Sequence, residues 1–279
     1  MNRRAFLQQS AGGLVALALP HRLAGAAGVA RLDRIGVQLY TVREVLQRDF
    51  EGTLARIARI GYQEVEFAGY MGRTAAQVRD AVRRVGLSAP SAHVPLAALG
   101  EGWDRVLEDA HTIGHRYVVM PWLDEKDRQN LDSYRRIAER LNRAGEAAAR
   151  AGIRFAYHNH NFEFAPMENR LPYDVLLEST DPGHVSFELD LYWITKGGQD
   201  PLAYFARWPG RFRLVHVKDS AGPPEHRMAD VGAGTIDWGR IFKRRKEAGI
   251  EHFFVERDDP PEPFASVGAS YAYLRDLRF

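Results

Sequence analysis

The feature that most constrains this chain is a regular alternation of short apolar runs with amphipathic segments. Eight runs rich in β-branched and aromatic residues are typical of strands, and each is followed by a segment whose apolar residues have helical spacing. Such alternation favours a parallel sheet. The predicted strands span residues 34–40, 63–67, 87–93, 116–120, 153–158, 185–191, 212–217 and 252–256. The predicted helices span residues 50–60, 74–85, 103–113, 130–151, 172–178, 200–208, 236–248 and 264–277.

No change in composition separates one strand–helix unit from the next, so residues 28–279 are predicted to form one α/β domain. Eight units in about 250 residues favour closure into a (β/α)8 barrel, the TIM barrel, over an open doubly wound sheet. The first predicted strand is not followed by a G-x-G-x-x-G turn, which further disfavours a dinucleotide-binding sheet.

The first 27 residues have a different character from the rest of the chain. Arg3 and Arg4 precede a short apolar stretch from Ala11 to Pro20, and the small residues Ala24 to Ala26 follow. This is the order of a cleavable signal peptide, and the arginine pair resembles a twin-arginine export signal. The apolar stretch is shorter than the ~20 residues that cross a bilayer, which disfavours a membrane anchor. Residues 1–27 are therefore predicted to be removed and the barrel to be exported to the periplasm.

Charge and cysteine content narrow the possible partners. The 279 residues contain 38 Lys and Arg against 36 Asp and Glu, a formal net charge of +2, so no strong field favours a nucleic acid or an anionic membrane. The chain has 0 cysteines, so neither disulfides nor thiolate ligands enter the prediction. A small molecule is the expected partner, and a homo-oligomer is compatible with the sequence.

Ionisable residues lie where four consecutive predicted strands end: Glu163, Asp190, His216 and Glu256. Because the carboxyl ends of parallel strands meet at one rim of a barrel, these side chains are expected to converge. Gathered carboxylates repel one another unless a cation neutralises them, and three carboxylates with one imidazole form a hard ligand set. The pattern predicts one divalent metal ion, with Mn²⁺ favoured and Mg²⁺, Co²⁺ or Zn²⁺ also compatible.

Strand parity supports this prediction. Successive side chains of a strand point to opposite faces, and an apolar set on one face leaves polar groups on the other, facing the barrel axis. The inward sets are Ala156, His158 and His160; Ser186, Glu188 and Asp190; Leu214, His216 and Lys218; and Glu64 with Glu66.

Each predicted ligand also has an ordinary structural explanation. A lone histidine such as His216 is often a core residue bonded to backbone, and Asp190 can cap a helix. Glu256 can pair with the neighbouring Arg257. Glu163 lies several residues beyond its strand, so His158 or His160 can take its place as the ligand. The joint occurrence of the four groups favours the metal site.

Further polar and aromatic residues at the predicted rim are candidates for substrate binding. An aromatic side chain beside groups that bind hydroxyls is suited to the face of a sugar. Lys218 can alternatively form a structural ion pair with Asp219. The candidates are Glu66, His93, His158, His160, Trp193 and Lys218.

Five motifs, taken in order, resemble the sugar phosphate isomerase/epimerase superfamily. This is the xylose isomerase-like TIM-barrel group that also contains inosose dehydratases, ketose 3-epimerases and the family 2 AP endonucleases. The resemblance covers about residues 35–279 and is specific for the superfamily rather than for a substrate. The motifs span residues 157–164, 188–193, 216–219, 231–237 and 255–256.

The resemblance implies a Glu, Asp, His, Glu metal site, matching Glu163, Asp190, His216 and Glu256. It also implies that the two glutamates, Glu163 and Glu256, act as acid and base on opposite faces of a sugar carbon, as in ketose epimerases. The chain departs from the epimerases at its fifth strand, where the run from Tyr157 to His160 replaces a terminal ligand glutamate. That departure resembles the dehydratase and lyase branch.

We therefore predict a metal-dependent isomerase or epimerase that removes a proton next to a carbonyl of a non-phosphorylated sugar. The metal would stabilise an enediolate, and Glu256, Glu163, His158 or His160 would be the base. A lyase that dehydrates a keto-sugar or cleaves a 3-keto-glycoside is the first alternative. A sugar-binding barrel without catalysis is the second, and a hydrolytic nuclease fits poorly because the sequence lacks a basic groove.

Overall fold

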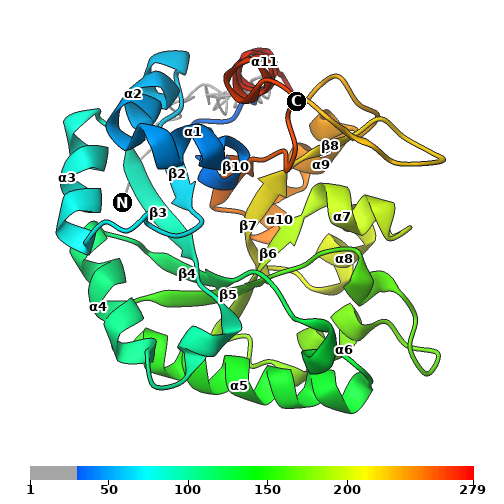
Figure 1. Cartoon of the computed structure of the whole chain (residues 1–279). Coiled ribbons are helices and arrows are strands. Elements are labelled where there is room, and N and C mark those ends of the chain that lie inside the picture. The colour runs from blue at the N-terminus through cyan, green and yellow to red at the C-terminus, as the bar shows by residue number, and fades with distance from the viewer. Residues whose placement is uncertain (1–29) are drawn as a thin grey trace, which may run out of the picture.

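The computed structural model describes residues 30–279. Its core is a closed barrel of parallel strands in the order β1-β10-β7-β6-β5-β4-β3-β2, with helices around it (Figure 1). The predicted (β/α)8 fold is confirmed, whereas the predicted signal peptide lies outside the described residues. The strands are β1 (Gly36–Gln38), β2 (Glu64–Phe67), β3 (Ser88–His93), β4 (Tyr117–Met120), β5 (Arg154–His158), β6 (Val185–Asp190), β7 (Phe212–Val217) and β10 (His252–Val255).

The helices follow the predicted pattern, with additions. The sequence prediction missed α1, α7 and the hairpin of β8 (Asp219–Ser220) with β9 (Met228–Ala229), and the predicted helix 236–248 is divided into α9 and α10. The helices are α1 (Arg43–Arg48), α2 (Phe50–Ile60), α3 (Ala75–Arg84), α4 (Trp103–Ile113), α5 (Leu131–Arg150), α6 (Pro172–Ser179), α7 (Leu191–Lys196), α8 (Pro201–Arg207), α9 (Trp238–Lys243), α10 (Arg245–Ala248) and α11 (Pro263–Asp276).

The barrel interior contains an apolar layer between two charged layers. Inward side chains from β4, β5, β7 and β10 form this layer, and all are fully buried. Position 36 requires glycine because the Phe254 ring fills the space beside it: a Cβ on Gly36 would lie 2.5 Å from that ring. The predicted parity of the fifth strand is confirmed, since Ala156 belongs to the layer. Its members are Tyr117, Val119, Ala156, Leu214 and Phe254.

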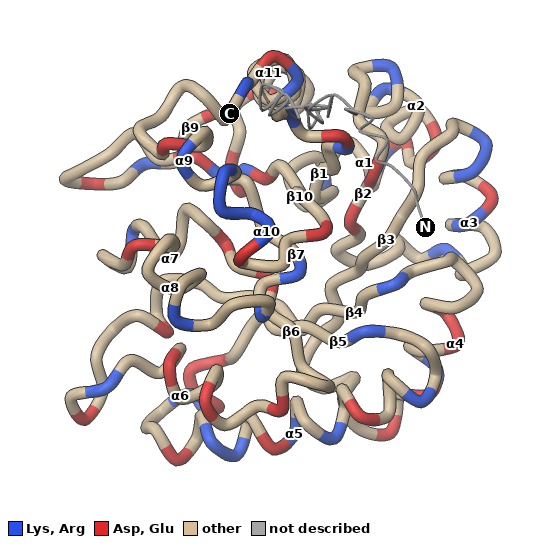
Figure 2. The backbone as a smooth tube through the Cα atoms, turned by 180° about the vertical axis from the view of Figure 1, so that it is seen from behind, with Lys and Arg blue, Asp and Glu red and all other residues tan. Residues whose placement is uncertain are grey.

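Charged residues on the outside of the barrel are mixed in sign. Figure 2 shows basic and acidic segments interspersed around the ring of helices, with a basic run along α9 and α10. None of the helices within residues 30–279 combines the length and apolar character needed to cross a membrane.

Candidate metal centre and cavity

Three of the four predicted ligands meet at the carboxyl end of the barrel. Each of Asp190, His216 and Glu256 is buried and offers a ligand atom within 4.8 Å of the other two. His216 Nδ1 lies 2.8 Å from Glu256 Oε2 and 3.8 Å from Asp190 Oδ2. They converge because β6, β7 and β10 are neighbours in the barrel and Asp190 pairs with His216 in the strand register.

Asp190 has two roles, one for each carboxylate oxygen. Oδ1 caps helix α7 by accepting hydrogen bonds from Tyr192 N at 2.9 Å and Trp193 N at 2.8 Å. Oδ2 is buried and accepts no hydrogen bond, although Lys218 Nζ lies 3.2 Å away. Burial raises the pKa of Asp190 to about 6, although Lys218 opposes that shift. The capping role expected from the sequence is therefore present, and it leaves one oxygen free to bind a cation.

Lys218 lies beside the candidate ligands and carries the positive charge nearest to them. Its Nζ is 2.7 Å from Glu256 Oε2 and 2.7 Å from Asp258 Oδ1. Burial alone would lower the pKa of Lys218, but the carboxylates of Asp190, Glu256 and Asp258 raise it well above its ordinary value. The expected alternative, an ion pair between Lys218 and Asp219, is wrong, and Asp258 is a member of this group that the sequence prediction did not include.

Asp219 instead organises the loop before α9. Its carboxylate accepts hydrogen bonds from Gly232 N at 2.9 Å, Ile236 N at 3.2 Å and Trp238 Nε1 at 3.0 Å. A Cβ on Gly234 would lie 2.2 Å from Asp219 Oδ1, so only glycine permits this close approach. The motif spanning residues 231–237 therefore has a structural role: its backbone N–H groups hold Asp219, the residue that follows Lys218.

A second layer of buried groups orients His216 from below. His216 Nε2 lies 2.7 Å from Glu66 Oε2 and 3.2 Å from Glu188 Oε2. Glu66 also accepts a hydrogen bond from Gln38 Nε2 at 2.7 Å. A carboxylate that accepts the second N–H of a histidine fixes which ring nitrogen is free to bind a metal. Glu66 therefore leaves Nδ1 of His216 facing Asp190 and Glu256.

These paired charges hold one another in their ionised forms. Burial alone would raise the pKa of Glu66, but the imidazoles of His93 and His216 lower it below its ordinary value. Burial alone would lower the pKa of His216, but the carboxylates of Glu188 and Glu256 raise it well above that of a free histidine. The same balance raises the pKa of His93 to about 9, against the effect of burial, through Glu66 and Glu188.

Glu188 is a site residue that the sequence prediction did not select. Its Oε2 lies 2.8 Å from His93 Nε2 and 3.3 Å from His158 Nδ1, and its Oε1 is buried without a hydrogen bond. His93, His158, Glu188 and His216 form a second group with converging ligand atoms. Strand parity in the sequence could have identified Glu188, since it shares the inward face of β6 with Asp190.

Glu163 does not join either group. Its Oε1 accepts a hydrogen bond from Tyr157 OH at 2.5 Å, and its Oε2 accepts one from His160 N at 2.8 Å. Strand β5 ends at His158, and the chain then turns through a short 3-10 helix, Phe162–Phe164, which holds the carboxyl group against the outward-facing Tyr157. Burial raises the pKa of Glu163 to about 7. The ionisable side chain at the carboxyl end of β5 is therefore His158, which the sequence analysis gave, with His160, as the alternative to Glu163.

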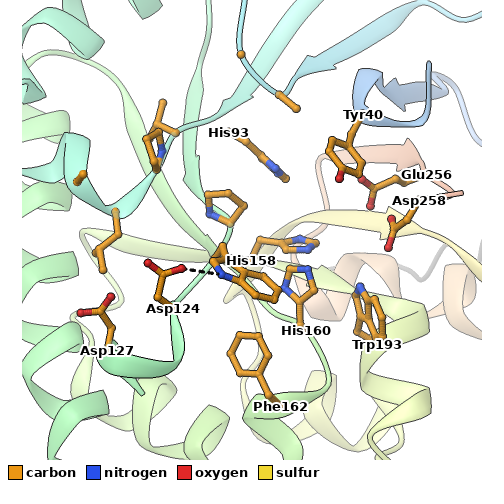
Figure 3. A pocket seen from close by; sticks show the side chains of 18 of the residues that line it. Tyr40, His93, Asp124, Asp127, His158, His160, Phe162, Trp193, Glu256 and Asp258 are labelled. Carbon is orange, nitrogen blue, oxygen red and sulfur yellow. Dashed lines mark hydrogen bonds between the residues drawn. The ribbon is translucent and has the colours of Figure 1, made fainter. Parts of the chain in front are cut away.

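A cavity of about 1050 Å³ opens over this end of the barrel. Figure 3 shows Tyr40, Glu256 and Asp258 on one side of it, Asp124 and Asp127 on the other, and His158 and His160 between them. Five of the six predicted substrate-binding residues line the cavity, and Glu66 does not, because it is fully buried below. The five are His93, His158, His160, Trp193 and Lys218.

The residues present fit a divalent cation. Asp190 Oδ2 and His158 Nδ1 are buried without hydrogen-bond partners, which is costly for polar atoms unless a ligand satisfies them. The carboxylates at this end, Glu66, Glu188, Asp190, Glu256 and Asp258, outnumber the cationic groups of His93, His216 and Lys218, and neighbouring carboxylates repel one another. Asp190, His216 and Glu256 would hold the ion, with His158 as the nearest group from β5.

The fold and the rim together define a TIM barrel with its ionisable groups at the carboxyl ends of the strands, where barrel enzymes carry their chemistry. Residues 54–277 match the family model "Xylose isomerase-like TIM barrel", and the chain belongs to that family. The superfamily predicted from the five sequence motifs is confirmed.

Several relatives share the barrel. An inosose dehydratase from Lacticaseibacillus casei is 29% identical over 199 residues, which span 64% of this chain and 66% of that protein. One from Geobacillus thermodenitrificans is 24% identical over 267 residues, covering 81% of this chain and 89% of that protein. The crystal structure of a sugar phosphate isomerase/epimerase from Parabacteroides distasonis has a TM-score of 0.76 at 28% identity, covering 92% of this chain and 98% of that one.

Proposed function

We propose that this chain is a divalent-metal-dependent enzyme that removes a proton next to a carbonyl group of a non-phosphorylated sugar, giving an isomer or epimer. The observation that carries the proposal is the convergence of Asp190, His216 and Glu256 at the carboxyl end of the barrel, where Glu256 lines the cavity. A cation held there, with Mn²⁺ favoured, would act as a Lewis acid for negative charge that develops on substrate oxygens.

Three ionisable side chains that line the cavity, Glu256, His158 and His160, are unprotonated at pH 7. Burial alone would raise the pKa of Glu256, but Lys218 and His216 lower it well below its ordinary value, so this residue is a carboxylate. Burial lowers the pKa of His160 to about 3 and that of His158 well below its ordinary value, so both rings are neutral at pH 7. These three groups are therefore unprotonated at pH 7, as a general base must be before it takes the substrate proton.

The position of Glu163 favours elimination as the second candidate function. Two-base epimerisation needs a second acid on the opposite face of the sugar carbon, and Glu163 is hydrogen-bonded to Tyr157 and the backbone of His160 instead. With one base, loss of the proton is followed by departure of the group on the next carbon, which takes the bonding electrons and leaves a double bond. The inosose dehydratases among the relatives carry the name of such a reaction.

The choice of a non-phosphorylated substrate rests on the proposed export of the chain. Arg3 and Arg4 ahead of an apolar stretch support a periplasmic location, where phosphorylated sugars of central metabolism are scarce. Comparing the size of the exported protein with that of the full chain tests this proposal directly, and an intact amino terminus would contradict it.

Solvent proton exchange tests the proposed reaction. We expect the Mn²⁺-loaded protein to exchange the hydrogen next to the carbonyl of a keto-hexose or keto-inositol in ²H₂O, observed by NMR, and Glu256→Gln to slow exchange by about a thousandfold. Glu251→Gln, at the other end of the barrel, is the control. No exchange with any keto-sugar, together with sugar binding that survives a chelator, would instead support a binding protein.

A further inference from the structure

The two exposed large hydrophobic side chains in residues 30–279 both line the same cavity. Tyr40 is 42% exposed and Trp122 is 45% exposed. Tyr40 follows β1 and Trp122 follows β4, so they reach the cavity from different parts of the rim. Aromatic surface left in water beside a concave site is a feature of ligand recognition. The aromatic groups therefore extend the site beyond the metal-binding residues.

Trp122 is held in one orientation. Its Nε1 donates a hydrogen bond to Asp124 Oδ1 at 3.2 Å. Its ring packs nearly perpendicular to those of His160 and Phe162, with centroid distances of 4.7 and 5.3 Å. The stacked pair of His160 and Phe162 continues this aromatic wall toward Trp193, 5.4 Å from His160. A continuous row of aromatic rings thus leads from Trp193, beside Lys218, to Trp122.

The cavity is larger than a single sugar ring requires. Its volume of about 1050 Å³ is at the upper end of sites that enclose drug-sized ligands, and a monosaccharide is smaller than those ligands. Glu256, the candidate ligand that lines the cavity, lies on one side of it, and Asp124 and Asp127 lie on the opposite side (Figure 3). A ring bound at the metal-binding residues therefore leaves the Trp122 side available.

The polar side chains near Trp122 are better suited to a ligand with hydroxyl groups than to one with a phosphate group or an unsubstituted aromatic ring. Asp124 and Asp127 balance Lys126 and Arg140 in charge, so a phosphate would meet two carboxylates. Among the residues that the structure describes, no side chain pairs with Asp127. Carboxylates accept hydrogen bonds from hydroxyls, while an aromatic face covers the C–H surface of a sugar.

We propose that Trp122, Asp124 and Asp127 form a second ring-binding subsite, and that the substrate is a keto-sugar carrying a second sugar ring through a glycosidic bond. This inference rests on the proposed function, since it places the reacting ring at Asp190, His216 and Glu256. It narrows the substrate class from sugars in general to disaccharide-sized glycosides.

The test compares ligands of one and two rings on the Mn²⁺-loaded protein. Calorimetry and saturation-transfer NMR measure the affinity of glucose, of maltose, cellobiose, sucrose and trehalose, and of 4-nitrophenyl glucoside. We expect at least one disaccharide to bind roughly tenfold more tightly than glucose, and Trp122→Ala to remove most of that difference, the effect that one aromatic contact supplies. Asp127→Asn should weaken the same disaccharide, and Trp208→Phe, outside the cavity, serves as the matched control.

Three results would overturn the proposal. One is a Trp122→Ala protein that folds and keeps the full preference for the disaccharide. Another is a preference for the nitrophenyl glucoside that Asp127→Asn does not alter, which would assign the subsite to an aromatic group. The third is equal affinity for glucose and every disaccharide. A disaccharide preference in a protein without proton exchange would support the subsite while contradicting the proposed enzyme.

Discussion

Both ends of the barrel carry carboxylates, but the groups that surround these carboxylates differ. At the amino end, His252 Nδ1 lies 2.7 Å from Glu64 Oε2, and Glu251 contacts three arginines, the nearest being Arg154 at 2.7 Å. At the carboxyl end, Glu188 Oε1 and Asp190 Oδ2 have no hydrogen bond. The apolar layer around Phe254 separates the two ends.

The difference indicates which charges stabilise the fold and which are available for chemistry. Arginines outnumber the carboxylate they surround at the amino end, so the negative charge of Glu251 is neutralised within the protein. At the carboxyl end, five carboxylates outnumber the cationic groups of His93, His216 and Lys218, and two of these carboxylates, Glu256 and Asp258, line the cavity. A buried charge without a partner is expensive, so the carboxyl end is expected to bind a cation.

The largest difference in metal binding and proton exchange is expected between alanine variants of two inward histidines on neighbouring strands. His216→Ala removes a ligand atom from the centre, so bound metal should be lost and proton exchange should fall by about a thousandfold or more. His252→Ala, at the amino end, should lower stability and retain metal. Metal analysis and exchange rates of both variants check this, and equal losses in the two would contradict the distinction between the ends.

Two glutamates on the same face of β2 give a finer comparison. Glu66→Gln removes the carboxylate that orients His216, and metal affinity should weaken by about 10–100-fold. Glu64→Gln alters the pairs with His252 and Arg34 at the amino end and should leave metal affinity within about twofold, the ordinary scatter between unrelated variants. Metal titration by calorimetry distinguishes the two variants. A lower metal affinity in Glu64→Gln than in Glu66→Gln would refute this role of Glu66.

Glu163 should affect stability rather than metal binding, and with a defined pH dependence. Burial raises its folded-state pKa to about 7, so between its unfolded pKa and that value the folded state holds more protons than the unfolded state. Its contribution is therefore present at low pH and is lost as pH rises toward 7, on the order of 3 kcal/mol. Denaturant unfolding at pH 5 and pH 8 should show a smaller pH effect in Glu163→Gln than in the wild type.

The smallest effect is expected at the amino end. Arg213 lies 3.4 Å from Glu251, is 38% exposed, and shares that carboxylate with Arg116 and Arg154. Arg213→Ala should reduce the free energy of unfolding by less than about 1 kcal/mol, because exposed ion pairs contribute little and the remaining arginines still pair. Thermal unfolding measures it, and a loss of metal in this variant would show that the two ends are coupled.

Much of the fold was predictable because the strand–helix alternation is strong and local. Helices α2 and α4 begin and end where the apolar spacing and the closing glycines predict. Helix α7 was missed because Leu191 to Ile194 has the composition of a strand, and the cap from Asp190 decides its conformation. The β8–β9 hairpin was missed because each strand has only two residues, Asp219–Ser220 and Met228–Ala229, too short to give a periodic pattern.

The candidate site was predictable where a polar residue follows an uninterrupted strand. Asp190, His216 and Glu256 meet that condition and converge. Glu163 does not, since the turn after His158 carries its carboxyl group away from the axis. Glu188 was overlooked because only the last polar residue of each strand was counted, although its parity placed it on the same face as Asp190.

Metal analysis of the purified protein tests the central claim most directly. After loading with Mn²⁺, Co²⁺ or Zn²⁺ and removal of excess, the wild type should retain about one ion per chain, a chelator should remove it, and His216→Ala and Glu256→Gln should fail to retain it. Glu163→Gln should retain it. No retained metal after supplementation, or a metal that depends on Glu163 and not on His216, would contradict the account.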